Sequence, residues 1–236
     1  MSQGDLSLKE DTLYWRAHQL VKEGVLERLA PGRYRLISRR QIPFAMEPWA
    51  ELGQAAEEVH RERPQLKCCV WQTDFLSNFM VQQVTFHFGL IEVERSAVDL
   101  VFGLVAESVK SLQGRVFIWN TAIRNSIAHG MAQAAYTSSN YQAKPVYVKA
   151  MPSVAPLQRT EGYHVPRIEK VLIDLFCDPI LFAAFQGYEL EEIIAGVLNR
   201  YPVNPTTLRR YGQYRERWEM FKASFGHLFD EKGLVL

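Results

Sequence analysis

The sequence predicts an α+β protein in which a short helix and a β-hairpin at residues 1–40 precede a larger mixed α/β domain at residues 41–236. Two observations predict the first part: a helical spacing of apolar residues, and a Pro-Gly turn between two alternating stretches. A third predicts the second part, because apolar strand-like runs alternate there with helical patterns. The C-terminal part of this domain is expected to be helical.

The first helix is expected at residues 8–23. Its apolar residues share one face, Ser7 is suited to cap its first turn with Glu10 as reciprocal partner, and Gly24 is suited to end it. Two short alternating stretches follow at 25–29 and 34–37, joined by the turn at Pro31-Gly32. The apolar face of the helix consists of Leu13, Ala17, Leu20 and Val21.

Residues 39–48, which contain two prolines and two adjacent arginines, are expected to form a linker. The C-terminal third of the second domain is strongly helical at 166–199, where Asp178-Pro179 interrupts the pattern, and again over 205–229. Before that, helices are expected at 48–63, 96–110 and 120–136, a short helix from Asp74 to Met80, and strands at 68–72, 86–93, 115–119 and 145–149.

The composition excludes several classes of protein. Hydrophobic residues make up 47% and charged residues 22% of the chain, which are ordinary values for a globular protein. No signal peptide and no membrane-spanning stretch is visible, so a cytoplasmic protein without a membrane partner is expected. Cys68, Cys69 and Cys177 lie in apolar runs and are expected to be buried, reduced thiols. No spacing typical of a metal site or of a cofactor site is present.

Charge is concentrated at the N-terminus. The net charge is +1 for the whole chain, but residues 1–40 hold eight Lys and Arg against five acidic residues. A polyanion responds to such local charge, so the helix and hairpin are candidates for DNA contact. The exposed helix face would present base-reading and phosphate-binding groups, and the hairpin would add arginines. The predicted DNA-binding residues are Lys9, Thr12, Tyr14, Trp15, Arg16, His18 and Gln19 on the helix, and Arg28, Arg33 and Arg35 on the hairpin.

Several stretches resemble the AbiEi-type antitoxins and related bacterial regulators. The string DTLYWRAHQLVKEGVLERLAPGRYRL is similar to their N-terminal winged helix, with a helix that ends in LVKEG and a Gly-Arg-Tyr wing at residues 32–34. The stretch 155–179 resembles their central helix, and CVWQTDFLSNFM with FGLIEVE resembles an uncharacterised branch of the same group. In this chain the residues that match the pattern of the central helix are Pro166, Glu169, Lys170, Leu172, Asp174 and Leu175.

The resemblance implies a function that composition alone does not. It implies a non-enzymatic antitoxin of a type IV toxin–antitoxin pair, which binds double-stranded operator DNA through its winged helix and represses its own operon. The implied functional partner is a nucleotidyltransferase-like toxin encoded nearby, with or without direct contact. A winged helix normally has further helices before its recognition helix, and only seven residues precede Leu8. We therefore expect a partial winged helix, consisting of the recognition helix and the β-hairpin wing.

Two rival functions remain open at the sequence level. Arg124 and His129 match the Arg-polar-x-x-x-His pattern that resembles the active site of HEPN ribonucleases, where His129 would act as general acid/base and Arg124 would steady a phosphate. That fold is an all-helical bundle, whereas strands are expected on both sides of this motif. The second rival is a non-enzymatic interaction module that has lost DNA binding.

Two further patterns have both a functional and a structural interpretation. Glu92 and Glu94, with Asp74 upstream, are similar to the acidic strand of metal-dependent nucleases, but alternating acids also suit a solvent-facing strand. The C-terminal arginines interleaved with aromatic residues suit either a phosphate or a solvated helix face over an aromatic stripe. They are Arg209, Arg210, Arg215 and Arg217, beside Tyr211, Tyr214 and Trp218.

Overall fold

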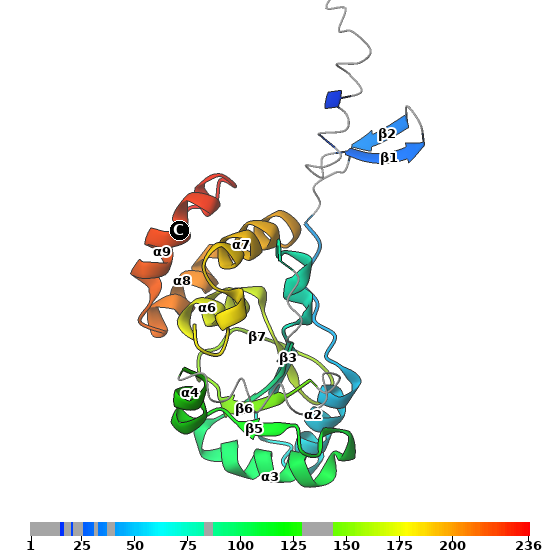
Figure 1. Cartoon of the computed structure of the whole chain (residues 1–236), viewed down its shortest axis with the longest axis vertical. Coiled ribbons are helices and arrows are strands. Elements are labelled where there is room, and N and C mark those ends of the chain that lie inside the picture. The colour runs from blue at the N-terminus through cyan, green and yellow to red at the C-terminus, as the bar shows by residue number, and fades with distance from the viewer. Residues whose placement is uncertain are drawn as a thin grey trace, which may run out of the picture. The chain divides into compact units, whose positions relative to one another are not determined.

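The structure, a computed structural model, separates the chain into two compact units, Met1–Ile42 and Pro43–Leu236 (Figure 1). In the first unit it describes Trp15, Arg16, Leu20 and two short strands. It also describes residues 41 and 42 at the end of the first unit. In the second unit it describes residues 43–82, 87–128 and 144–236.

The two strands of the first unit form an antiparallel hairpin. β1 (Leu26–Ala30) pairs with β2 (Arg33–Leu36), and a register shift falls between Arg28 and Ala30. Pro31 and Gly32, the predicted turn dipeptide, lie outside the described residues. The pairing of β1 with β2 confirms a β-hairpin at this place. The recognition helix lies mostly outside the described residues, so the winged helix itself stays a prediction.

The second unit is built on a six-stranded mixed sheet with the order β5-β6-β4-β3-β8-β7. β4, β5 and β6 run parallel to one another, β3 runs antiparallel to β4, and the short strand β8 runs parallel to β3 and antiparallel to β7. The strands are β3 (Cys69–Gln72), β4 (Gly89–Val93), β5 (Val116–Ile118), β6 (Val146–Ala150), β7 (Leu157–Arg159) and β8 (His164–Pro166).

Both faces of this sheet are covered by helices. Alternate residues of each strand point to opposite faces, and the buried apolar residues accordingly divide into two clusters. In β4, for example, Leu90 belongs to the larger cluster and Ile91 to the smaller one. The unit is therefore a three-layer sandwich, which confirms the predicted mixed α/β domain with a helical C-terminal part (Figure 1).

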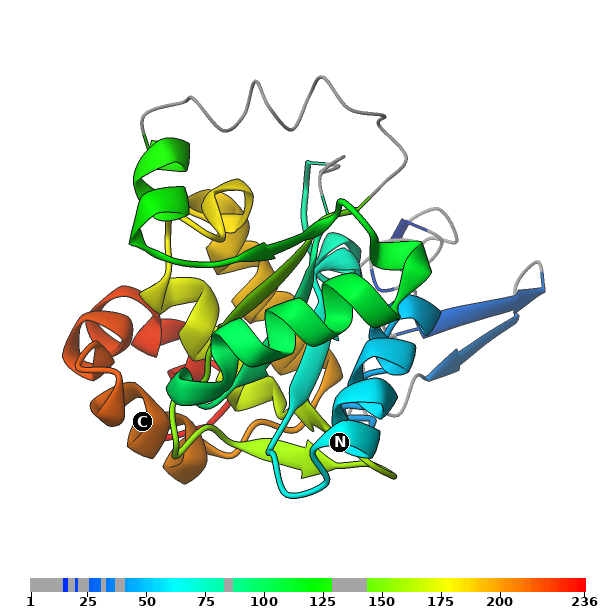
Figure 2. The ribbon, with the colours of Figure 1, turned by 90° about the horizontal axis from the view of Figure 1, so that it is seen from below.

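The smaller cluster lies between the sheet and helices α2 (Ala50–Glu62) and α3 (Val98–Ser108). Figure 2 shows α3 lying across this face of the sheet. α2 approaches β4 very closely at Gly89, where an added Cβ would stand 2.9 Å from a methyl carbon of Leu52. A side chain at residue 89 would force the side chain of Leu52 to shift, so glycine suits this close approach.

The larger cluster lies under four C-terminal helices. Leu172 and Leu175 of the first helix, with Trp71 and Leu90 from the sheet, lie in this core. Trp71 stacks on Phe182 at a ring-centroid distance of 5.7 Å. The helices are α6 (Ile168–Cys177), α7 (Tyr188–Arg200), α8 (Pro205–Tyr214) and α9 (Trp218–Asp230).

Short helices and one isolated helix complete the described part of the unit. α4 (Thr121–Ala128) follows β5, and the rest of the helix predicted at 120–136 lies outside the described residues. The short helices are η1 (Asp74–Asn78), η2 (Arg95–Ala97), η3 (Lys110–Leu112) and η4 (Ala183–Phe185).

Three expectations need correction. The β7–β8 hairpin was not expected, and the helix predicted at 205–229 is two helices that meet at residues 215–217. Cys68 and Cys69 are buried free thiols as predicted, but Cys177, near the end of α6, is only partly buried. Among the described residues, no helix is long and apolar enough to cross a membrane.

Candidate functional site

A buried cluster of charged side chains lies between the sheet and α6. It begins with a row across three strands, because the strand register sets Cys69 beside Glu92 and Glu92 beside Lys149. These positions share the sheet face that is covered by the C-terminal helices. Glu92 is completely buried, and the indole Nε1 of Trp71 donates a hydrogen bond of 3.0 Å to its Oε2.

Lys170 supplies the central cation of this cluster. It stands in the first turn of α6, is fully buried, and donates from Nζ to Glu92 Oε2 and, at 2.5 Å, to Asp174 Oδ2. Asp174 lies one helical turn further along, so the helix itself aligns the two side chains. Lys170 thus joins α6 to the central strand of the sheet by a bond between buried charges.

Asp174 extends the cluster to the far end of α8. Tyr211 donates from its hydroxyl to Asp174 Oδ1 at 2.8 Å, and the Nη1 of Arg215 donates to the same oxygen. Arg215 Nη1 also lies 3.3 Å from the hydroxyl of Tyr211. The end of α8 is therefore fixed by one carboxylate of α6.

The cluster is electrically balanced. Lys149 lies 3.7 Å from Glu92 Oε1 and 3.6 Å from Asp178 Oδ2, which adds one cation and one anion. Lys149, Lys170 and Arg215 then stand against Glu92, Asp174 and Asp178, three charges of each sign. Buried charges are tolerated when they are paired, and each charge here has an opposite partner. Glu92 Oε1, which lies 3.7 Å from the ammonium of Lys149, accepts no hydrogen bond.

The pKa values of the central groups follow from this pairing. Burial alone lowers the pKa of Lys170, but the opposite charges of Asp174 and Glu92 outweigh burial and hold it well above its usual value. Burial raises the pKa of Asp174, but Lys170 and Arg215 outweigh that effect and lower it. Burial, followed by the charge of Asp174, raises the pKa of Tyr211. The charged forms of Lys170 and Asp174 are thus the stable ones, and Tyr211 stays protonated.

This cluster corrects the sequence interpretation of the acidic strand. Glu92 does not face solvent; it is sealed inside the protein and neutralised by lysines. No three His, Cys, Asp or Glu side chains in the described part of the chain gather so as to hold a metal ion. A nuclease-like metal centre on Glu92, Glu94 and Asp74 therefore finds no support in this geometry. We interpret the cluster as a structural junction between the sheet and α6.

An open pocket of about 630 Å³ adjoins one end of this cluster. It lies at the carboxyl ends of the parallel strands β4 and β6, where Glu94 and Arg95 follow one strand and residues 151–153 follow the other. Lys67, just before the antiparallel β3, lies at the same edge. The other wall is the junction between α8 and α9, with Tyr214, Arg215 and Glu216.

Glu216 in this wall has an unusual backbone conformation. Its φ of 55° is the only positive value among the described non-glycine residues. The amide of Glu216 donates to Gln213 O and the amide of Arg217 donates to Gly212 O, the two bonds of a Schellman motif. The left-handed position in that motif is normally glycine, because other L-residues are strained there. Strain of this kind is often found at functional sites.

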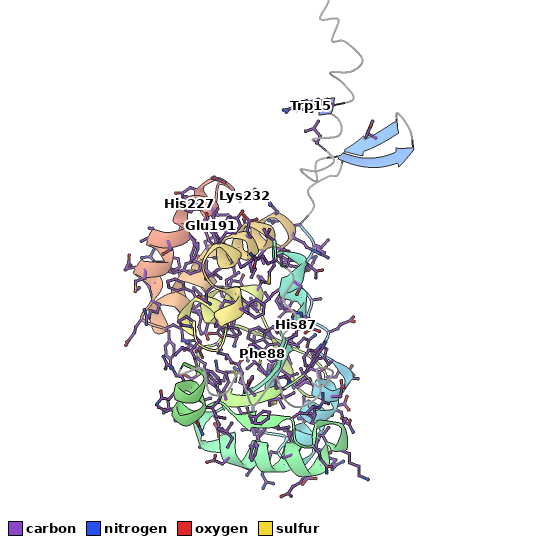
Figure 3. All side chains as sticks on the ribbon, in the orientation of Figure 1. Trp15, His87, Phe88, Glu191, His227 and Lys232 are labelled. Carbon is purple, nitrogen blue, oxygen red and sulfur yellow. The ribbon has the colours of Figure 1, made fainter. Side chains whose placement is uncertain are left out.

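A second polar cluster gathers around Asp74. The indole of Trp49 donates to Asp74 Oδ2 at 3.0 Å, and the ammonium of Lys144 binds the same oxygen. His87, labelled in Figure 3, has its Nε2 3.3 Å from Ser77 Oγ and its Nδ1 3.7 Å from Asp74 Oδ1. The order Ser–His–Asp is that of a hydrolase triad, but Nδ1 of His87 and Oδ1 of Asp74 are too far apart for a hydrogen bond, and Asp74 is held by Trp49 and Lys144 through its other oxygen, Oδ2. We therefore interpret this cluster as structural.

The structure describes only some of the residues predicted to bind DNA. Lys9, Thr12, Tyr14, His18 and Gln19 lie outside the described residues. Trp15 and Arg16 are both exposed, Trp15 by 62%, and Trp15 is labelled in Figure 3. Arg28 lies in β1, and Arg33 and Arg35 lie in β2.

The predicted ribonuclease pair is described only in part. Arg124 is exposed on α4, and His129 lies outside the described residues. α4 follows β5 of a mixed sheet, rather than standing in a helical bundle.

The α6 residues of the pattern that resembles the central helix of AbiEi-type antitoxins have structural roles. Lys170 and Asp174 form the buried cluster, Leu172 and Leu175 enter the core, and Glu169 Oε1 accepts a bond of 2.7 Å from the amide of Asn204 before α8. No local pattern indicated that Glu92, Lys149 and Arg215 join these residues, although the lysine and aspartate at i and i+4 on an apolar helix were a signal that partners exist.

Comparison with known proteins gives one finding. A family of unknown function, DUF6577, matches residues 12–230. The chain belongs to this family. The match spans both units, so the hairpin, the charge cluster and the pocket all lie inside the region shared with DUF6577. No curated protein matches the chain.

Replacing Lys170 by methionine should strongly destabilise this DUF6577 protein. The change keeps the volume but leaves Glu92 and Asp174 buried without their main cation, which costs about 3–5 kcal/mol. Tyr211→Phe is the matched control, because it removes one hydrogen bond and should cost about 1 kcal/mol. Urea unfolding followed by tryptophan fluorescence measures both. A loss for Lys170→Met no greater than that for Tyr211→Phe would contradict the assigned role.

Replacing Glu216 by glycine should stabilise the protein. The change relieves the left-handed strain, and after the entropy of the added glycine the gain is about 0.5–1 kcal/mol. Glu219→Gly is the control, because Glu219 is exposed in the first turn of α9 and glycine there costs about 1 kcal/mol. The measurement is thermal unfolding. Equal destabilisation by both substitutions would show that Glu216 is not strained.

Proposed function

We propose that this protein is a DNA-binding transcriptional regulator whose N-terminal unit contacts double-stranded operator DNA. The observation that carries the proposal is the arginine-bearing β-hairpin β1–β2 in a unit that is compact by itself. Arginines on such a hairpin suit contacts to phosphate oxygens, which supply most of the affinity of a protein for DNA. The exposed Trp15 and Arg16 supply further groups for base edges and phosphates.

The charge distribution supports the same proposal. The first 40 residues carry a net charge of +3, while the remaining 196 carry −2. The register of the hairpin sets Arg35 opposite Glu27, but sets Arg33 opposite Ala30, near the turn. Arg33 therefore has no acidic cross-strand neighbour, and we expect it to contribute more to DNA binding than Arg35 does.

The resemblance to AbiEi-type antitoxins gives the proposal its biological form. The partial winged helix would bind the operator of its own operon, and the second unit would play no enzymatic part. A nucleotidyltransferase-like toxin encoded nearby would be the functional partner. Support comes from the similarity of the N-terminal string and of the pattern from Pro166 to Leu175, whose α6 residues hold the second unit together.

The proposal predicts salt-dependent binding to the upstream DNA of its own gene. The full chain should bind that DNA more tightly than a random duplex of equal length in a gel-shift titration. Affinity should fall with salt by a log–log slope of roughly −0.9 per phosphate contact, and Arg33→Ala should flatten the slope by about one unit. Arg35→Ala should have a smaller effect.

The control is Arg63→Ala, an exposed arginine of the second unit whose guanidinium donates to the carbonyl of Glu62. This variant should bind DNA as the unmodified chain does. Equal affinity for both duplexes, or an unchanged salt slope in Arg33→Ala, would refute the proposal.

A further inference from the structure

The pocket at the carboxyl ends of β4 and β6 has the position and size of a ligand site. In open α/β sheets, ligands bind outside the carboxyl ends of parallel strands, in the crevice formed by the loops that follow them. The volume of about 630 Å³ lies within the range of pockets for small molecules and cofactors. Its walls come from four separate parts of the second unit, namely the segment before β3, the ends of β4 and β6, and the α8–α9 junction.

Three cations line the pocket: Arg215, which is paired with Asp174, and Lys67 and Arg95, which are not paired with any described acidic residue. Lys67 and Arg95 are exposed, and neither forms an ion pair with another described residue. Arg215 forms both of its hydrogen bonds through Nη1, so Nε and Nη2 remain available as donors. Lys67, Arg95 and Arg215 line one space together with the carboxylates of Glu94 and Glu216, and the three cations suit a phosphate group.

Arg215 is already oriented before any ligand binds. Its side chain is 19% exposed, and the buried carboxylate of Asp174 holds the guanidinium in place. A guanidinium that is fixed in advance loses little conformational freedom when it binds an anion. This distinguishes the pocket from a patch of flexible surface lysines.

The pocket also offers groups that a bare phosphate would not use. Glu216, held in its strained conformation, is a carboxylate suited to accept hydrogen bonds from sugar hydroxyls, whereas Glu94 is engaged by Ser96 at 3.1 Å. Tyr214 is 51% exposed, and its ring is available for stacking on a base. The hydroxyls of Ser153, which follows β6, and of Tyr214, at the α8–α9 junction, lie 3.4 Å apart.

We propose that this pocket binds a nucleoside phosphate. Lys67, Arg95 and Arg215 hold the phosphate, Glu216 accepts from the ribose, and Tyr214 stacks on the base. An isolated inorganic phosphate satisfies only the cations, and it leaves the carboxylate of Glu216 beside an anion. The proposal concerns the second unit and stands independently of DNA binding by the first.

The test is calorimetric titration of the full chain with four probes: AMP, GMP, adenosine and inorganic phosphate. At least one nucleotide should bind with a dissociation constant below about 1 mM, and more tightly than adenosine or inorganic phosphate. The double variant Lys67→Ala/Arg95→Ala should weaken that binding at least tenfold, the size of effect expected for two charged hydrogen bonds. Lys110→Ala, an exposed lysine of η3, is the control and should bind as the unmodified chain does.

Binding of the ribose by Glu216 is tested separately, with a nucleotide that lacks the ribose hydroxyls. The unmodified chain should bind the nucleotide more tightly than its 2′,3′-dideoxy analogue, and Glu216→Gly should abolish this difference while remaining folded by circular dichroism. Saturable binding of inorganic phosphate as tight as that of the nucleotides would overturn the proposal. So would the absence of nucleotide binding, or binding that the double variant leaves unchanged.

Discussion

The bond between Lys170 of α6 and Glu92 of β4 is the constraint on which the second unit depends. Both side chains are completely buried, so each charge has lost its water and must find compensation inside the protein. Only one placement of α6 on the sheet brings Lys170 to Glu92 while Leu172 and Leu175 enter the core. We infer that the pair specifies how the helical layer sits on the sheet, even where apolar residues of equal volume would be as stable.

Asp174 connects the buried Lys170–Glu92 pair to Arg215 in the wall of the pocket. Asp174 binds Lys170 with one oxygen and receives Tyr211 and Arg215 on the other, so the end of α8 is fixed relative to α6. The chain then turns sharply through Glu216, where Gly212 allows α8 and Trp218 to meet; an added Cβ would stand 2.8 Å from the indole. A buried charge pair, a helix end and a strained turn thus combine to position one guanidinium at the surface.

Much of the second unit follows from local sequence patterns. The runs that became β3, β4, β5 and β6 are short and apolar, and the stripe on α6 predicted a helix with one buried face. The β7–β8 hairpin was missed because its strands are only three residues long and carry no turn signal strong enough to outweigh the helical pattern that follows. The break between α8 and α9 was missed because glutamate rather than glycine occupies its left-handed position.

The charge cluster could be predicted only in part. Lys170 and Asp174 share a helix face in an apolar stretch, which is a signal for buried partners that our sequence prediction did not use, and Glu92, Lys149 and Arg215 come from distant segments. Their meeting depends on strand order and register, which no local pattern encodes. For the same reason the pocket, assembled from four separate segments, had no signature in the sequence.

The most direct test of this account is the pH dependence of unfolding for the unmodified chain and for Asp174→Asn. The pKa of Asp174 is lower in the folded protein than in the unfolded chain. The ionised carboxylate therefore contributes its full share of stability at pH values above the unfolded-state pKa of about 4, and this share is lost as the pH falls through the folded-state pKa. The unmodified chain should therefore be more stable than Asp174→Asn at neutral pH, by about 3 kcal/mol, and this difference should shrink steadily in acid. A difference that stays constant with pH would contradict the account, because the charge of Asp174 would then contribute nothing to the fold.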